Sequence, residues 1–293
     1  MAKKKAAKYN RFSIFDGILY LIMILVMASI IVPFIHVIAV SFSGTGPVMA
    51  GKVGLWPVEF TLHTYQEIMK DGAFLNAYAN TIFVTVVGTV LSLIITAMCA
   101  YALSRRAIVG HKVFSIMITI TMFFGGGMIP TYLAVQSYGL LESRWAMIIP
   151  YLLNTWNMII MRSFFIAYPS EIIESGQIDG LQDAGVFFRL VLPTSKAALA
   201  TIALYYAVAY WNAYMPSRLY IQARQELRPV QHLLQRMISS ASSIEQNSVG
   251  EAPLVASSIR YASIMVVITP IMCVYPFLQK YFVKGVMVGS VKG

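Results

Sequence analysis

The sequence predicts an all-α integral membrane protein with six transmembrane helices. Hydrophobic residues make up 58% of the 293 and charged residues only 12%, whereas an ordinary soluble domain carries about 25% charged residues. The apolar residues also fall in long blocks, and about 18 consecutive apolar residues can cross the ~30 Å hydrocarbon core as a helix. A helix satisfies its backbone hydrogen bonds within the span, and the alternating pattern of a membrane β-barrel is absent from the sequence. These observations exclude a soluble enzyme.

Six apolar stretches are long enough to be spans. The first follows a basic segment and is too long for a signal-peptide core, so we expect it to be a retained helix. Cys99 and Cys273 fall inside spans, which predicts small apolar side chains rather than a disulfide or a metal site. The predicted spans are residues 14–42, 80–103, 113–135, 145–161, 197–216 and 261–282.

The distribution of charge predicts that both termini face the cytoplasm. Basic residues gather in the cytoplasmic loops of membrane proteins. With the N-terminus inside, 14 of the 22 basic residues lie in cytoplasmic segments, and the net charge of +10 needs no nucleic-acid partner. This topology divides the chain into a cytoplasmic N-terminal tail (1–13), a transmembrane domain (14–282) and a cytoplasmic C-terminal tail (283–293). The long loops are 43–79 and 218–260 outside and 162–196 inside.

The cytoplasmic loop contains a predicted helix–turn–helix at residues 169–193. Ser170 can cap a first helix after Pro169, and Glu171 is favourable in its first turn. Gly180 permits a left-handed residue at the turn, and a second segment at 181–190 ends at Leu192–Pro193. A short amphipathic pair of this kind is suited to a groove on another protein.

The same residues resemble the EAA motif of the permease subunits of bacterial ABC importers. That pattern runs E-A-A, two residues, D-G, then a phenylalanine, and closes on L-P. Ser175 and Gly176 replace the alanine pair, and Gly176 should weaken the first helix by up to ~1 kcal/mol relative to alanine. The resemblance implies that the matching residues couple the chain to an ATPase: Glu174, Ile178, Asp179, Gly180, Phe187, Arg189, Leu192 and Pro193.

The resemblance covers nearly the whole chain. The run Gly-Gly-Gly-Met-Ile-Pro-Thr-Tyr at 125–132, the pair Trp211–Asn212 and the run 228–236 look like the carbohydrate-type permeases. The closing run at 279–293 looks like the subgroup that handles complex or acidic oligosaccharides, such as alginate or pectin fragments. The glycines at 125–127 before Pro130 also predict an interruption of the third span, as a hinge or a site of close packing.

The resemblance implies a type I importer permease in the bacterial inner membrane, crossing it several times. The chain would pair with a second, homologous permease and dock on an ATPase dimer, and an extracytoplasmic solute-binding protein would deliver the sugar. The sequence contains no GxxxxGK[ST] phosphate-binding loop, so ATP and Mg²⁺ would be bound by the partner ATPases and no cofactor by this chain.

Polar residues in or near the spans are candidates for a substrate path. An unpaired amide is costly in a membrane, and interhelical hydrogen bonding is the alternative interpretation. Aromatic faces suit the C–H faces of sugar rings, although tryptophan is also common at membrane interfaces. The candidates are Asn154, Asn157, Trp211 and Asn212.

Two other functional classes compete with this interpretation. A stand-alone secondary transporter usually carries ionisable residues inside its spans, and here only Asp16 lies at the edge of one. A membrane-embedded transferase needs a catalytic cluster, and no His/Asp/Glu group with such spacing lies at a membrane face. Arg218, Arg224, Arg228 and Arg236 make the second outer loop basic, which suits a docking face, an acidic sugar or simple solvation.

Overall fold

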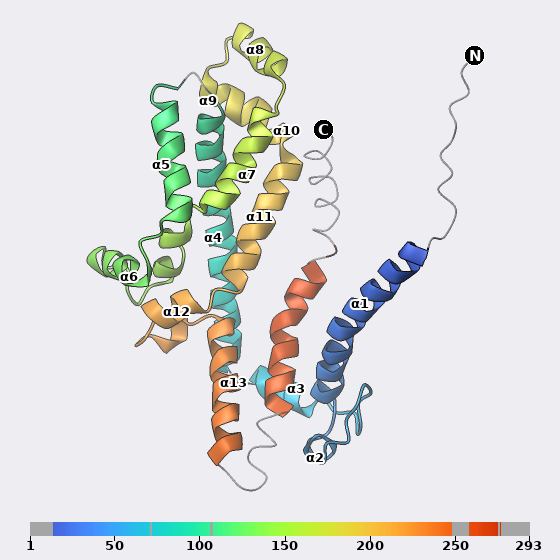
Figure 1. Ribbon diagram of the computed structural model, residues 1–293. Coiled ribbons are helices and arrows are strands. Elements are labelled where there is room, and N and C mark those ends of the chain that lie inside the picture. Colours follow the sequence, from blue (N-terminus) through green and yellow to red (C-terminus); the bar gives the residue numbers. More distant parts are fainter. Residues whose placement is uncertain (1–13, 71, 106–107, 248–257, 275, 277–293) are drawn as a thin grey trace, which may run out of the picture. The chain divides into compact units, whose positions relative to one another are not determined.

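The computed structural model describes residues 14–70, 72–105, 108–247, 258–274 and 276, so the predicted cytoplasmic tails, 1–13 and 283–293, lie outside the described residues. Within the described part of the chain every regular element is helical, as the sequence predicts (Figure 1). The chain divides into two compact units, one of Met1–Ile68 with Ser240–Val266 and one of Met69–Ser239 with Val267–Gly293.

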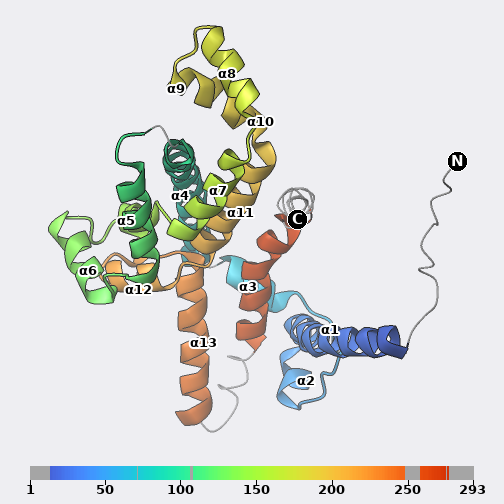
Figure 2. The same cartoon turned by 45° about the horizontal axis from the view of Figure 1, so that its top comes forward.

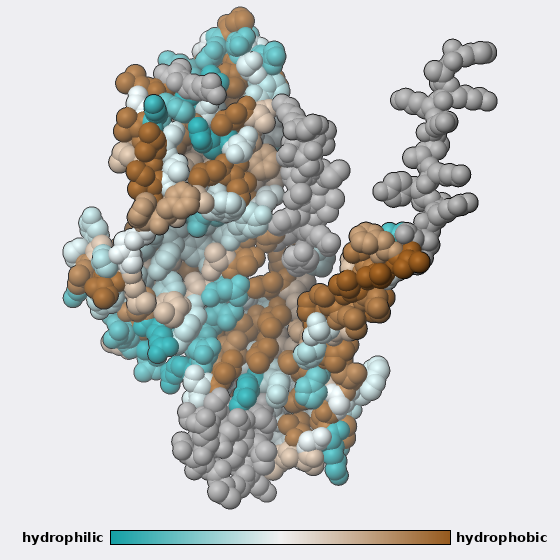
Figure 3. Space-filling view, in the orientation of Figure 1, coloured by the Kyte–Doolittle hydropathy of each residue, from teal (hydrophilic) through white to brown (hydrophobic). Residues whose placement is uncertain are grey.

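The first unit contains the first predicted span as α1 (Ile14–Ser41), a continuous helix of 28 residues. Large apolar side chains along α1 are exposed, and Figure 3 shows hydrophobic side chains covering this helix. The end of α1 is held by polar contacts, because Ser43 Oγ donates to the Ala39 carbonyl at 2.6 Å and accepts from the Val58 N–H at 3.0 Å. Two short helices follow, α2 (Thr45–Met49) and α3 (His63–Lys70).

The second unit is built on α4 (Gly72–Ser104), a helix of 33 residues that is about 50 Å long at 1.5 Å per residue. It packs against α7 (Thr155–Ile166) and α11 (Lys196–Trp211) (Figures 1 and 2). Gly88 allows α11 to approach α4 closely, because a Cβ at this position would lie 2.8 Å from the ring of Tyr210. This three-helix core holds the functional loops at its two ends.

The predicted third span is broken, as its glycines indicate. Helix α5 (His111–Phe123) ends before the glycine run, and α6 (Met128–Ser137) follows at an angle of 115°. Gly127 has φ +82°, a conformation that a residue with a side chain rarely adopts. Glycine therefore permits the change of direction.

The other predicted spans differ from the helices in their limits. The prediction for 145–161 is wrong over its first half: two 3₁₀ turns, η1 (Arg144–Met147) and η2 (Ile149–Tyr151), precede α7. The reason is local, because Asn154 Oδ1 accepts the Asn157 N–H at 3.0 Å and so starts α7 as its N-cap. The expected span 80–103 begins earlier, at Gly72, and 197–216 is divided into α11 and α12 (Met215–Tyr220).

Two described helices, α1 and α4, are each long and apolar enough to cross a membrane. The number of such spans rises to as many as four if each of the two bent helix pairs counts as one span. The second bent pair joins Asp183–Thr194 to α11 at 82°. The sixth predicted span corresponds to an apolar helix at Ser258–Val274, and residues 277–282 of that prediction lie outside the described part. The predicted outer loop before it contains η4 (Gln225–Leu227) and α13 (Val230–Asn247).

Candidate functional site

The loop that we predict to be cytoplasmic folds as the expected helix–turn–helix. Its first helix, α8 (Ser170–Ile178), ends in a Schellman motif: the Gly180 N–H donates to the Gln177 carbonyl at 3.0 Å, and the Leu181 N–H donates to the Gly176 carbonyl at 2.9 Å. Gly180 has φ +84°, which explains why glycine is needed there. Ser170 lies inside the helix and is not its cap; the N-cap position is Pro169, with no side-chain hydrogen bond.

The second segment is longer than predicted. Helix α9 (Asp183–Val186) continues through a π-helical turn, η3 (Phe187–Val191), into α10 (Leu192–Thr194). The segment ends at Thr194, one residue after the predicted end at Leu192–Pro193 and directly before α11. In the π-helical turn the Leu192 N–H bonds to the Phe187 carbonyl, and this wider register accommodates a proline that cannot donate a hydrogen bond.

An aromatic cluster anchors this loop to the helix core. Phe187 is only 4% exposed, and its ring lies 4.9 Å from the ring of Tyr101 on α4 and 6.4 Å from that of Phe165 on α7. Ile173, Val186 and other apolar residues of the loop join the same buried core. Phe187, which the motif places among the coupling residues, is thus an internal anchor. Its position ties the loop to two helices at once.

The remaining motif residues lie mostly on the solvent-exposed surface of this loop. Ile178 is 85% exposed, a large apolar side chain without cover among the described residues. Gly176 is the exception to the sequence-based expectation, because it is buried and a Cβ there would lie 2.6 Å from Leu190 Cδ1. Because glycine replaces the alanine of the motif at position 176, the Leu190 side chain has space to pack there. Glu174, Asp179, Gly180, Arg189 and Pro193 are exposed as well, and Leu192 is half-buried.

Two tyrosines of α11 connect the core helices and line a cavity that also contains polar side chains. The Tyr206 hydroxyl lies 2.7 Å from Thr96 Oγ1 and accepts the Asn154 N–H at 2.9 Å. The Tyr210 hydroxyl lies 2.9 Å from Ser92 Oγ. These tyrosines line a cavity of about 300 Å³ together with the predicted path residues Asn154 and Asn157, and with Tyr151.

The other two predicted path residues are not part of that cavity lining. Trp211 contacts Tyr78 of α4 edge-to-face at 6.3 Å, and its indole Nε1 is buried without a hydrogen-bond partner among the described residues. Asn212 ends α11, and its Oδ1 accepts a hydrogen bond from Gln231 Nε2 at 3.2 Å. The structure therefore separates the four residues into two pairs.

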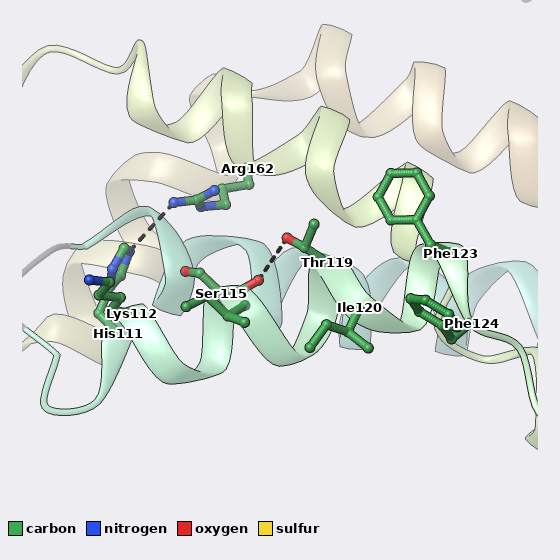
Figure 4. A pocket seen from close by; sticks show the side chains of 9 residues that line it. His111, Lys112, Ser115, Thr119, Ile120, Phe123, Phe124 and Arg162 are labelled. Atoms are coloured by element: carbon green, nitrogen blue, oxygen red, sulfur yellow. Dashed lines mark hydrogen bonds between the residues drawn. The ribbon is translucent and has the colours of Figure 1, made fainter.

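Helix α5 borders an open apolar groove (Figure 4). The groove has a volume of about 390 Å³ and ends at three basic side chains, His111, Lys112 and Arg162. No residue of α5 is buried within the described part of the chain, and Figure 3 shows hydrophobic side chains along it. This face is open to another apolar surface.

Glu142 is a structural residue that sequence reasoning missed. Its carboxylate accepts the backbone N–H groups of Gln222, Ala223 and Arg224 at 2.8, 3.1 and 2.9 Å. Desolvation raises the pKa of Glu142, but these hydrogen bonds and Arg228 together hold it below its ordinary value. The carboxylate thus clips the outer loop to the turn after α6. Its sequence neighbourhood carries no signal for this contact, because the partners are backbone groups about 80 residues away.

Comparison with known proteins identifies the family. The chain is 41% identical over 283 residues to the polygalacturonan/rhamnogalacturonan transport system permease protein YtcP of Bacillus subtilis (strain 168), covering 96% of this chain and 99% of that protein. It is 40% identical over 265 residues to Protein LplC of the same organism, covering 90% of each chain. No family model matches.

A solved structure agrees with these relatives. It is described as a bacterial ABC transporter involved in the import of the acidic polysaccharide alginate, and a chain of it matches with a TM-score of 0.82 at 33% identity. The match covers 94% of this chain and 100% of that chain. The relatives are transport-system permeases, which implies ATPase and solute-binding partners and identifies a transport subunit rather than an enzyme. With its EAA-type loop on an all-helical membrane core, this chain belongs to the permease family of ABC sugar importers.

Proposed function

We propose that this chain forms half of the translocation path for an acidic, alginate- or pectin-like oligosaccharide in the bacterial plasma membrane. It crosses the membrane six times, with both termini in the cytoplasm. The substrate class is supported by the names of its relatives, which act on polygalacturonan, rhamnogalacturonan and alginate. The topology is supported by the charge distribution, since positively charged loops stay in the cytoplasm.

The observation that carries the proposal is the coupling loop. It combines a buried anchor, Phe187, with an exposed outer surface that includes Ile178 and Asp179. An ATPase dimer that binds ATP and Mg²⁺ docks on this outer surface. Because the anchor contacts both α4 and α7, movement of the docked ATPases is transmitted to the core helices as a rigid-body displacement.

Other surfaces suit the remaining partners. The exposed face of α5 accepts the second, homologous permease, because an uncovered apolar helix face needs an apolar partner. Membrane lipid covers α1, whose large apolar side chains are exposed. The outer loop, 218–260, receives the solute-binding protein. Substrate passes Asn154 and Asn157, with Trp211 and Asn212 as a second contact region.

The coupling role is tested with Gly180→Pro in the assembled importer. Gly180 has φ +84°, which proline cannot adopt, so the turn breaks while the membrane core remains. We expect sugar uptake in proteoliposomes to fall at least about tenfold, with normal membrane insertion. Gln182→Pro is the matched control, because Gln182 already has φ −74°. Normal uptake by the Gly180→Pro importer would refute the coupling role.

The substrate path is tested separately by sugar-stimulated ATPase activity. Asn157→Ala removes an amide from the cavity beside Tyr206 and Tyr210, and Trp211→Ala removes an aromatic face. If a residue contacts the substrate, we expect its alanine variant to need a higher sugar concentration for half-maximal stimulation of ATPase activity. If both variants keep the wild-type rate and half-stimulation, the path does not run past these residues.

A further inference from the structure

A second cavity lies where the predicted outer loop meets the start of α4. Its volume is about 320 Å³, and within the second unit it is formed by the first turns of α4, η4 and the start of α13. This is the opposite end of α4 from the aromatic anchor of the coupling loop (Figures 1 and 2). Its polar lining residues are Asn76, Gln225, Glu226, Arg228, His232 and Arg236.

The walls of this cavity are fixed by hydrogen bonds. Asn76 and Asn80 of α4 both donate from Nδ2 to the Glu226 carbonyl at 2.6 Å, and the Val230 N–H donates to Thr81 Oγ1 at 2.8 Å. Arg228 donates from Nε to the Ile221 carbonyl at 3.2 Å. The loop therefore holds its side chains in place before any ligand arrives, which lowers the entropic cost of binding.

The charge of the cavity is positive. Arg228 and Arg236 both line it, whereas its one lining carboxylate, that of Glu226, is paired with Arg224 at 2.9 Å. The Arg228 Nη1 and Arg236 Nη2 groups have no hydrogen-bond partner among the described residues, since only Nε and Nη2 of Arg228 and Nη1 of Arg236 are engaged. Guanidinium groups are well suited to bind carboxylates.

A buried histidine adds a neutral polar group to the same wall. His232 is 7% exposed, and its Nδ1 lies 3.0 Å from Ser217 Oγ. Its Nε2 has no hydrogen-bond partner in the described part of the chain. Desolvation, reinforced by Arg228, Arg236 and Arg218, lowers the pKa of His232 to about 4. A neutral imidazole has one N–H donor and one nitrogen acceptor, so it can exchange hydrogen bonds with sugar hydroxyls without adding charge to the cavity.

We propose that this cavity binds a uronic-acid residue of the transported oligosaccharide, with Arg228 and Arg236 contacting its carboxylate and His232 and Gln225 contacting its hydroxyls. The proposal rests on the function proposed above and adds a selective site at the outer end of the path. Chains that carry carboxylates are retained there, and neutral chains of the same length are not.

The test uses the complete importer, with its ATPases and binding protein, in proteoliposomes. The probes are trigalacturonate and its carboxyl-reduced neutral counterpart. Arg236→Gln is the test variant, because Arg236 is exposed at the cavity wall. Arg218→Gln is the control, since Arg218 is an exposed arginine of the same loop, does not line the cavity and is not paired with its carboxylate. We expect Arg236→Gln to lower uptake of trigalacturonate at least about tenfold, with Arg218→Gln within twofold of wild type and uptake of the neutral trimer unchanged.

Three results would overturn the site. Equal loss for both trimers indicates a structural role for Arg236, and unchanged uptake of trigalacturonate shows that the cavity is not used. A loss that is restored by excess binding protein indicates that Arg236 docks this partner instead. Failure of the underlying function is distinct, because the wild-type importer would then transport neither trimer or prefer the neutral one, before any variant is compared.

Discussion

The two functional loops of this permease are attached to opposite ends of α4 by different kinds of interaction. The coupling loop is held by an apolar cluster around Phe187 and Tyr101, with one aromatic ring at its centre. The outer loop is held by directed hydrogen bonds to Glu142, Asn76 and Asn80. The non-directional contact permits the loop to shift as a body, whereas the hydrogen bonds fix the outer loop in one register.

This difference suits the function that we propose for each loop. In that proposal the coupling loop transmits motion of the ATPases to the helices, and the ring contacts of Phe187 with both α4 and α7 supply the connection. A loop that presents side chains to a ligand needs fixed positions, and three backbone N–H groups on one carboxylate supply them. Glu142 adopts φ +57° to make this contact, a conformation uncommon for a residue with a side chain.

The largest expected effect is loss of the coupling-loop anchor. Phe187→Ala should empty the aromatic cluster and destabilise the loop by about 3–5 kcal/mol, because Phe187 is 4% exposed. Co-purification of the ATPase and thermal unfolding of the importer measure the effect. Phe188→Ala is the control for stability, since Phe188 is the next residue in the chain and its ring is 54% exposed. Equal destabilisation by the two variants would contradict the anchor.

The outer loop should respond to Glu142→Gln instead. An amide oxygen replaces a charged acceptor of three hydrogen bonds, so we expect a loss of about 1–3 kcal/mol. Amide hydrogen exchange at residues 222–224 should rise, while exchange in the coupling loop stays constant. Glu226→Gln, at an exposed ion pair, should leave the stability of the loop close to that of wild type. Unchanged amide exchange at residues 222–224 in Glu142→Gln would show that these three hydrogen bonds do not stabilise the loop.

A smaller effect is expected where α8 packs against η3. Gly176→Ala restores the alanine of the motif but places Cβ 2.6 Å from Leu190 Cδ1, so Leu190 must move. In a double-mutant cycle, Gly176→Ala with Leu190→Ala should be less destabilising than the sum of the single variants, by about 1 kcal/mol. Denaturant unfolding of the purified importer gives the three values. Additive values would mean that the two side chains do not compete for space.

The last effect is a pH dependence of the outer loop, which is small near neutral pH and grows as the pH falls. The pKa of His232 is lowered from 6.5 to about 4 in the folded protein, so the opened loop binds a proton between these values and the folded loop does not. Stability of the loop should therefore fall as the pH is lowered from 6.5 towards 4. Amide exchange of the first turn of α13 measures it. His232→Gln should remove the slope, and a slope that persists would assign the effect to another group.

Local chemistry made much of the coupling loop predictable. The turn at Gly180 follows from a glycine placed directly after the last turn of a helix, and the break at 125–127 follows from three glycines before a proline. The predicted end at Leu192–Pro193 lies within one residue of the observed end at Thr194, whereas the π-helical turn before this proline carried no signal that we recognised. The late start of α7 could have been read from Asn154 as an N-cap, a local signal that was interpreted as a polar lining.

By itself, the sequence determined the class of the molecule, its apolar helices and the position of its coupling loop, because composition, periodicity and turn residues act over a few neighbours. The tertiary structure alone decided the roles of side chains whose partners are distant in the chain. It made Phe187 an internal anchor, turned Gly176 from a weakness into a packing site, separated Asn157 from Trp211, and joined Glu142 to backbone groups 80 residues away. Contacts of this kind depend on which helices pack together, and no local pattern encodes them.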